Sequence, residues 1–263
     1  MKVLVTVKEV ATVDDEFEIS GTEIDDRYLG ADLNEWDEYA LEEAVRLSEE
    51  GVADEVVTVT IGSDDTEQTI RQALAKGADR AIRVWDDALE AADLLDVGAK
   101  TTILEAVVAE EDPDIVLTGV QSGDDSFGAT GVALAAELGT QWAAVVNDLE
   151  LDVDAGVASV HRELEGGVEE LTEIELPAVL SIQTGINEPR YASLRGIRQA
   201  QRKELAAKSL ADLGLDDEDV AGELTLTDMY EPETETDVKI FQGSAEDTAG
   251  ELAEMLRDSG VVG

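Results

Sequence analysis

The sequence predicts an α/β protein with a Rossmann-like, mostly parallel sheet flanked by helices, followed by an antiparallel meander and a C-terminal arm. Two observations lead to this prediction. Short apolar runs alternate with segments whose apolar residues recur every three or four positions, and this alternation continues through the first two thirds of the chain. Such an order implies right-handed β-α-β crossovers and therefore a parallel sheet. After Thr140 the apolar period changes to two, which is typical of antiparallel strands.

The predicted elements of the parallel part follow one another in a regular order. We expect Asn34 to cap the first long helix and Gly77 to end the second, because short polar residues suit an N-cap and glycine suits the position after a C-terminus. Strands are predicted at residues 3–7, 55–61, 81–85 and 115–117, a hairpin at 16–24, and helices at 34–51, 66–76, 91–110 and 132–138.

The second part of the chain is less regular. Strands are predicted at residues 147–153, 157–164, 168–174 and 177–182, an irregular segment at 187–194, and a basic helix at 195–208. Residues 212–263 are acidic and show little periodicity before a helix at 245–257, so they cannot build a core alone. We therefore expect an α/β domain at residues 1–208 and an arm at 209–263 that lies on a partner.

The composition excludes several kinds of site. The chain has no cysteine, which excludes disulfides, thiolate chemistry and cysteine-ligated metals, and its one histidine, His161, disfavours a histidine metal site or a Ser-His-Asp triad. We predict no metal site and no catalytic residues. The apolar stretches are shorter than a membrane span, and the N-terminus reads as a core strand rather than a signal peptide, which predicts a cytoplasmic protein that is not embedded in a membrane.

The charge balance points to an unusual environment. The 63 acidic and 18 basic residues give a net charge of −45, and the acids are spread along the whole chain. In low salt this charge should destabilise the compact state by self-repulsion, whereas molar salt reduces the screening length to about 3 Å. We therefore expect an extreme halophile as the source. Nucleic acid is excluded as a partner because phosphate recognition relies on lysine and arginine.

The segment from Pro113 to Gly131 is the strongest candidate for a binding site. An apolar strand ends in a long loop with four glycines, and a helix with apolar residues at helical spacing follows. Backbone N–H groups at such a junction can face a phosphate, and ligands of parallel sheets bind beyond the carboxyl ends of the strands. An ordinary connecting loop is the alternative. Neither a G-x-G-x-x-G at the first strand nor a G-x-x-x-x-G-K-[ST] motif is present, which disfavours dehydrogenase and P-loop kinase functions.

A second candidate is a cluster of positive charge in an otherwise acidic chain. Six of the 18 basic residues fall within the nineteen residues from Arg190 to Lys208. A charged run is most often a solvated helix face. In a chain this acidic, the cluster favours contact with an anionic group, either a cofactor phosphate or an acidic patch on a partner.

Seven segments in this order resemble the β subunit (small subunit) of electron transfer flavoproteins over essentially the whole chain. The resemblance is carried by VLVTVK at 3–8, Asn34 with ALEEAVRL at 40–47, TIRQALAKGADR at 69–80, DIVLTGVQSGD at 114–124, EGG at 165–167, LPAV at 176–179 and NEPRYASL at 187–194. The last string is the most specific. The family's fold is of the adenine nucleotide α-hydrolase-like type.

The resemblance implies a heterodimer with an α subunit, which shares an FAD with this chain. It implies electron transfer from acyl-CoA or other dehydrogenases to a membrane quinone oxidoreductase, and a structural AMP in this subunit. The implied AMP contacts are Thr6, Asn34, Ile61, Gly119, Val120, Gln121, Ser122, Gly123, Asp124, Asp125, Ser126, Phe127, Gly128, Ala129 and Thr130. Glu163 corresponds to a family glutamate near the flavin, although an exposed structural acid is an equal alternative.

The resemblance also implies that residues 187–208 form a partner-recognition loop and that the arm contacts the α subunit. Leu194 would enter a pocket of the dehydrogenase, with Tyr191, Arg195 and Arg198 around it. Val120, Phe127 and Gly128 depart from the family pattern, which leaves the nucleotide open. The alternatives are the β subunit of a bifurcating, NADH-oxidising complex with a second FAD in place of AMP, and a nucleotide-binding sensor without a redox role.

Overall fold

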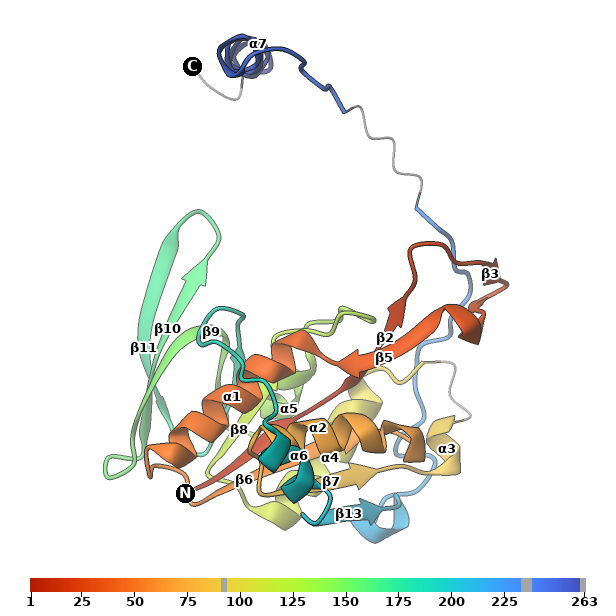
Figure 1. The fold of residues 1–263 in the computed structure, drawn as a ribbon. Helices are drawn as coiled ribbons and strands as arrows, with labels where there is room; N and C mark the ends of the chain where they lie inside the picture. The colour runs from red at the N-terminus through yellow and green to blue at the C-terminus, as the bar shows by residue number, and fades with distance from the viewer. Residues whose placement is uncertain (91–93, 233–237, 261–263) are drawn as a thin grey trace. The chain divides into compact units, whose positions relative to one another are not determined.

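The computed structural model describes residues 1–90, 94–232 and 238–260, and the chain forms two compact units, Met1–Met229 and Tyr230–Gly263 (Figure 1). The first unit is built around a nine-stranded sheet with the strand order β11-β10-β9-β12-β8-β1-β6-β7-β13. Among the described residues of this sheet, all pairings from β9 along this order to β13 are parallel, and only β9, β10 and β11 pair in antiparallel fashion. The predicted α/β class with a mostly parallel sheet is confirmed.

The central strands are buried over most of their length because helices cover both faces of the sheet. They are β1 (Lys2–Thr6), β6 (Glu55–Ile61), β7 (Arg80–Val84), β8 (Ile115–Gly119) and β12 (Ala178–Ile182). Their apolar runs place alternate side chains in opposite layers: Val3 and Val5 pack into one core cluster and Leu4 into the other. This explains why these strands are continuously apolar rather than alternating.

The helices contribute to two core clusters. Residues of α1 (Glu35–Glu49), α2 (Glu67–Lys76) and α6 (Leu194–Ala200) join one core cluster, and residues of α4 (Val97–Glu111) and α5 (Thr130–Leu138) join the other. From β1 the chain proceeds through β6 to β7 on one side, and it then returns to place β8 on the other side of β1. The point where the strand order reverses therefore lies between β1 and β8, where ligands of such sheets bind.

The N-terminal part differs in one respect from the predicted pattern. The expected hairpin is present as β3 (Ile19–Ser20) and β4 (Glu23–Ile24), followed by a 3-10 helix at Asp26–Tyr28. An antiparallel pair that the sequence pattern did not indicate encloses it, β2 (Glu9–Val13) with β5 (Leu29–Leu33). Most residues of this pair are exposed, so no apolar alternation marks it in the sequence.

The helix predicted at residues 91–110 begins later than expected. Helix α4 starts after Asp96, whose side chain accepts a hydrogen bond from the Ala99 N–H at 2.9 Å and caps the helix. A short helix, α3 (Asp87–Glu90), precedes it, and residues 91–93 of the predicted helix lie outside the described residues. Another 3-10 helix, at Asp64–Thr66, leads into α2.

The prediction of one basic helix from 195 to 208 is wrong. Helix α6 ends at Ala200, and residues Leu205–Lys208 form strand β13, which pairs in parallel with β7 at the edge of the sheet. The backbone of β7 needs hydrogen-bond partners on its open side, and this requirement outweighs the high helix propensity of leucine, alanine and lysine in the segment. A 3-10 helix at Ala211–Leu213 follows.

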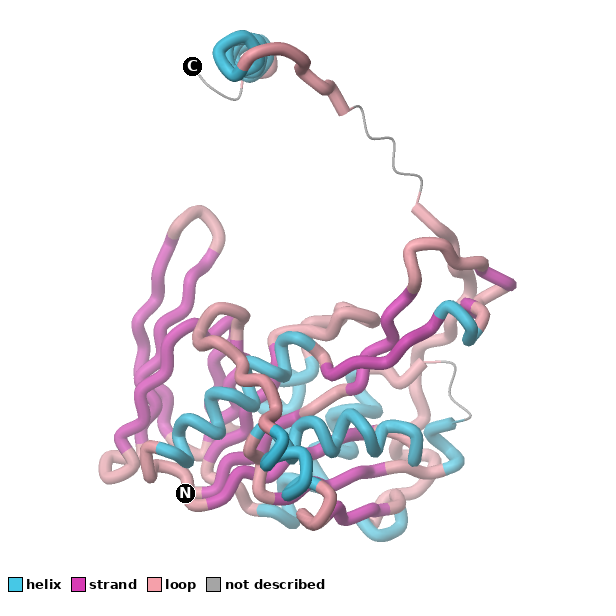
Figure 2. The backbone as a smooth tube through the Cα atoms, viewed as in Figure 1, coloured by secondary structure: helices cyan, strands magenta, loops and turns pink. Residues whose placement is uncertain are grey.

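The meander is longer than predicted at its first strand. Strand β9 (Gln141–Asp152) pairs in parallel with β12 through its first half and in antiparallel fashion with β10 (Val157–Leu164) through its second half. Strand β11 (Val168–Glu175) completes the sheet, and the three strands extend as a long ribbon (Figure 2). Val145 has a φ of 64° where β9 changes partner, an unusual value for a β-branched residue.

Among its described residues the second unit contains one helix, α7 (Ala245–Asp258), and no residue of this helix is buried. Ser244 caps it by accepting a hydrogen bond from the Asp247 N–H at 3.3 Å. The predicted helix at 245–257 is therefore confirmed, and its exposure agrees with an arm that has no core of its own. No helix within the described ranges is both long and apolar enough to cross a lipid bilayer.

Candidate functional site

Three predicted site residues stand at the carboxyl ends of neighbouring parallel strands. Thr6 ends β1, Ile61 ends β6 and Gly119 ends β8, and β1 lies between the other two strands. Side-chain and main-chain contacts hold these ends together, as the Thr60 hydroxyl donates to the Val7 carbonyl at 2.7 Å. The structure thus brings together strand ends that are more than a hundred residues apart in the chain.

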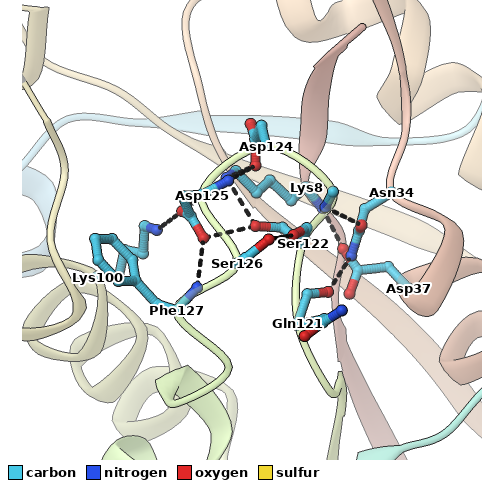
Figure 3. A network of polar contacts seen from close by, with 11 residues as sticks. Lys8, Asn34, Asp37, Lys100, Gln121, Ser122, Asp124, Asp125, Ser126 and Phe127 are labelled. Carbon is cyan, nitrogen blue, oxygen red and sulfur yellow. Dashed lines mark hydrogen bonds and ion pairs between the residues drawn. The ribbon is translucent and has the colours of Figure 1, made fainter. Parts of the chain in front are cut away.

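The loop between β8 and α5 is tightly folded rather than extended. Both the N–H and the hydroxyl of Ser126 donate to the Ser122 carbonyl, at 3.2 and 3.1 Å. Ser126 and Gly128 have φ values of 53° and 60°, in the left-handed region that short polar residues and glycine tolerate best. The Phe127 N–H donates to the Asp125 carboxylate at 3.2 Å, which fixes the turn from inside (Figure 3).

Two lysines from other elements neutralise the acids of this loop. The Lys8 ammonium, which follows β1, contacts Asp124 at 2.5 Å and Asp125 at 2.9 Å, and it donates to the Ser122 hydroxyl at 3.2 Å. The Lys100 ammonium, on α4, forms a second ion pair with Asp125 and lies 5.1 Å from the centroid of the Phe127 ring. Figure 3 shows that the two ammonium groups approach the loop from opposite sides.

These contacts keep both carboxylates ionised. Burial opposes ionisation of Asp125, but hydrogen bonds from Lys100, Lys8 and Ser122 outweigh it and hold its pKa far below the ordinary value. Partial burial likewise opposes ionisation of Asp124, and the Lys8 ammonium overcomes this cost and lowers the pKa of Asp124. The loop therefore offers carboxylate acceptors at any pH near neutrality, suited to ribose hydroxyl groups.

The last part of the loop presents backbone donors. Among the contacts of the described residues, the N–H groups of residues 128–132 donate to no other protein group. They lie at the start of α5, where the helix dipole favours an anion. Gly131 also allows close packing at this point, because a Cβ there would lie 2.5 Å from the Thr118 hydroxyl. Consecutive amides with this arrangement at a helix start fit a phosphate group.

Residues at the start of α1 also hold the loop through hydrogen bonds. Asn34 occupies the predicted N-cap position, but its side chain makes no capping bond. Instead its amide donates to the Gln121 carbonyl at 2.8 Å and accepts from the Gly123 N–H at 3.3 Å. Asp37 accepts from the N–H groups of Lys8 at 2.8 Å and of Gly119 at 3.0 Å. The polar contacts of Figure 3 thus join β1, α1, α4 and the loop.

The segment before α6 is fixed to α1 by its own polar contacts. Arg190 binds Glu42 through Nε and Nη2, at 2.8 and 2.9 Å, and it also binds Glu49. These carboxylates raise the pKa of Arg190, with hydrogen bonds from its guanidinium to Glu49 and Glu42 as the largest causes. Asn187 donates to the Tyr39 carbonyl at 3.0 Å. Residues 187–190 are therefore rigidly placed.

The residues that follow are, by contrast, exposed to solvent. Tyr191 is 97% exposed and Leu194 is 75% exposed, high values for large apolar side chains. Arg195 and Arg198 are exposed on α6 and, within the part of the chain that the structure describes, form no ion pair. Together with Arg202 they border a shallow depression of about 460 Å³. A second groove of about 930 Å³ separates this segment from α1 and α2.

The predicted basic cluster divides into two groups. Arg190 and Lys208 form ion pairs with glutamates, and Lys203 donates to backbone carbonyls that include Leu74 at 3.1 Å. These three residues have internal structural roles. The exposed residues of the cluster, all on one side of the segment, are Arg195, Arg198 and Arg202.

Some of the predicted residues lie apart from this site, and some residues of the site were missed. Glu163 is exposed on β10 opposite Glu169 of β11, and it makes no hydrogen bond to the loop within the described ranges. Asp37 and Lys100 were not among the predicted site residues. Lys8 belongs to the end of the first predicted strand, one of the strand ends expected to border the site. Nothing local in the sequence identifies Asp37 or Lys100.

Comparison with known proteins identifies the family. The family model of the electron transfer flavoprotein domain matches residues 22–213. The chain is 44% identical over 264 residues to an electron transfer flavoprotein subunit beta of Methylophilus methylotrophus, covering 98% of each chain. The chain belongs to the electron transfer flavoprotein family. It is also 34% identical over 234 residues to a mitochondrial subunit beta of Arabidopsis thaliana, covering 88% of this chain and 90% of the relative, and 31% identical to a subunit beta of Bacillus subtilis over the full length of both.

The electron transfer flavoprotein match covers both candidate surfaces. The Gly-rich loop and α6 both fall inside residues 22–213, whereas the second compact unit lies beyond them. The Bacillus subtilis relative nevertheless aligns over the whole chain, so this unit has a counterpart there. The predicted resemblance to this family, made from seven short segments, is confirmed.

Proposed function

We propose that this chain is the β subunit of a heterodimeric electron transfer flavoprotein. It would accept electrons from dehydrogenases, such as acyl-CoA dehydrogenases, through an FAD that it shares with an α subunit, and pass them to a membrane quinone oxidoreductase. The observation that carries the proposal is membership of the family along the whole chain. The FAD would supply the redox chemistry when bound. The residues of this chain would bind the FAD, orient it and shield it from solvent.

We propose further that the loop 119–130 binds AMP as a structural nucleotide. The amides of residues 128–132 would hold the phosphate, and the Asp124 carboxylate would accept hydrogen bonds from ribose. Lys8 and Lys100 would keep the acids of the loop compensated, so that the nucleotide's negative charge meets little net repulsion. Thr6, Asn34 and Ile61 would border the adenosine from the strand ends and the start of α1.

The exposed residues around α6 support a role in partner recognition. Leu194 would insert into an apolar pocket of the dehydrogenase, while Arg195 and Arg198 would meet acidic groups at its rim. Arg190 holds this segment in place through Glu42, so that little ordering is needed on association. The arm expected at residues 209–263 would lie on the α subunit, because its helix α7 buries no residue.

The proposal is tested by co-producing the chain with its α subunit and purifying the heterodimer. Adding a catalytic amount of an acyl-CoA dehydrogenase and its acyl-CoA substrate should bleach the flavin absorbance. The same mixture without dehydrogenase should leave the flavin oxidised. Bleaching by NADH alone would point to the bifurcating type, and a heterodimer without flavin would contradict the proposed function.

A further inference from the structure

Asp37 holds two strand ends together across the point where the strand order reverses. It is in the first turn of α1 and only 5% exposed. One carboxylate oxygen accepts from the N–H of Lys8, two residues after the end of β1, at 2.8 Å. The other accepts from the N–H of Gly119, at the end of β8, at 3.0 Å. These N–H groups lie at strand ends, and a carboxylate, which is an acceptor only, can satisfy both.

The fit between Asp37 and the end of β8 is close. A Cβ on residue 119 would lie 2.5 Å from a carboxylate oxygen of Asp37 and 2.7 Å from the Trp36 Cβ, so only glycine allows this approach. Gly119 is also the first residue of the loop. Any change in how Asp37 holds Gly119 therefore changes where the loop begins.

Lys8, the other residue whose N–H binds Asp37, also contacts the loop. The Lys8 backbone is bound by Asp37, and the Lys8 ammonium contacts Ser122, Asp124 and Asp125 further along the loop. From the same helix start, Asn34 holds Gln121 and Gly123. The first turn of α1 thus holds the loop at its origin and, through Lys8, at its centre (Figure 3).

We infer that Asp37 is a positioning residue of the nucleotide site: its carboxylate fixes the ends of β1 and β8 and thereby holds the loop 119–130 in the form that accepts a nucleotide. This inference rests on the proposed function in that the ligand is the AMP proposed above. It adds that ligand binding depends on a buried carboxylate that does not touch the ligand.

The ionisation of Asp37 gives the inference a pH signature. Burial raises its pKa to about 7, against the opposing hydrogen bonds from Lys8, Asn34 and Gly119. The charged groups nearby are the Lys8 ammonium and its partners Asp124 and Asp125, whose carboxylates stay ionised. Since a protonated carboxyl group loses one acceptor position, the loop should loosen as pH falls through about 7.

The experiment compares the wild-type heterodimer with Asp37→Asn and with Glu50→Gln, which removes an exposed charge at the far end of α1. AMP binding is measured by titration calorimetry on nucleotide-stripped protein between pH 6 and 8. Asp37→Asn should weaken binding about 10- to 100-fold, because one N–H must then face an amide NH₂ group. The phosphate of AMP titrates near pH 6 and by itself makes binding depend on pH. Asp37→Asn should remove the pH dependence of binding that exceeds this contribution. Glu50→Gln should change neither.

Amide hydrogen exchange of the unliganded proteins gives a second readout that needs no nucleotide. Residues 119–127, which include the loop amides with protein acceptors, should exchange faster in Asp37→Asn at pH 8, and faster in the wild type at pH 6 than at pH 8 after correction for intrinsic rates. Unchanged exchange in this loop would overturn the inference even if AMP binds. If the exchange of this loop changes as expected but the wild type binds no AMP, the result would instead contradict the proposed nucleotide.

Discussion

The guanidinium of Arg190 binds the buried carboxylate of Glu42 through two nitrogens, at 2.8 and 2.9 Å. This pair joins the segment that presents Tyr191 and Leu194 to the middle of α1. A two-point contact between a planar guanidinium and a carboxylate fixes orientation as well as distance. The proposed partner-recognition surface is therefore attached to the same helix whose first turn supports the loop 119–130.

Glu42→Gln should weaken docking of a dehydrogenase without removing the flavin. The amide cannot accept from both guanidinium nitrogens, so the segment 187–194 would lose its fixed orientation and pay for ordering on association. We expect the KM for the heterodimer in a dehydrogenase-coupled assay to rise by about tenfold, the effect of one lost charge-assisted contact. Glu50→Gln is the matched control. An unchanged KM in Glu42→Gln would show that this contact does not position the recognition surface.

Leu194→Ala should slow electron transfer from a dehydrogenase more strongly than any rim substitution. Leu194 is 75% exposed, so its truncation costs the free protein little stability, whereas a central apolar anchor typically carries about 2 kcal/mol or more of binding, about 30-fold in affinity. Stopped-flow flavin reduction measures the rate, and the absorbance ratio of flavin to protein measures FAD content, which should stay constant. Leu224→Ala, another exposed leucine, serves as control. Equal rates in both variants would remove Leu194 from the recognition role.

Gly119→Ala should destabilise the protein and release the nucleotide. The added Cβ would lie 2.5 Å from Asp37 and cannot be accommodated without moving β8 or α1. Overpacking of this kind costs about 1–3 kcal/mol, measured by urea unfolding. Gly123→Ala is an internal control in the same loop, because a Cβ added there would meet no atom within 4 Å and its backbone needs no left-handed conformation. If both variants were equally stable, the close approach at Gly119 would be unimportant.

The net charge of −45 predicts a strong dependence of stability on salt. Self-repulsion opposes folding at low ionic strength and is screened to about 3 Å in molar salt. The unfolding temperature should therefore rise by at least about 5 °C from roughly 0.1 to 2 M KCl, roughly 1–2 kcal/mol for a chain of this size. Differential scanning calorimetry on the heterodimer measures this. An unfolding temperature that did not change with salt would exclude adaptation to a salt-rich cytoplasm.

Local signals in the sequence predicted most strands of the sheet and the Gly-rich loop of the candidate site. The apolar strands, the N-cap position of Asn34 and the Gly-rich loop were all recognisable, because each depends on neighbours in the chain. Strand β13 was not, since it forms only because β7 offers an open edge. Long-range hydrogen bonding decided its structure, and helix periodicity did not.

The residues that hold the loop were harder to predict for the same reason. Lys100 reaches Asp125 from α4, and Asp37 reaches Gly119 across 82 positions of the chain. An aspartate in the first turn of a helix is ordinary, because the helix dipole favours a negative charge there. Its role becomes visible only when the ends of β1 and β8 are placed beside it. By contrast, the exposure of Arg195 and Arg198 agrees with the predicted role in partner recognition. The partner itself remains a prediction.

We propose that this chain is a subunit of an electron carrier with one redox flavin and one structural nucleotide. The most direct measurement is to denature the purified heterodimer, separate the released nucleotides by chromatography and quantify them against protein. One FAD and one AMP per heterodimer are expected. Two FAD molecules and no AMP would assign the complex to the bifurcating type, and a complex that released no flavin would contradict the claim.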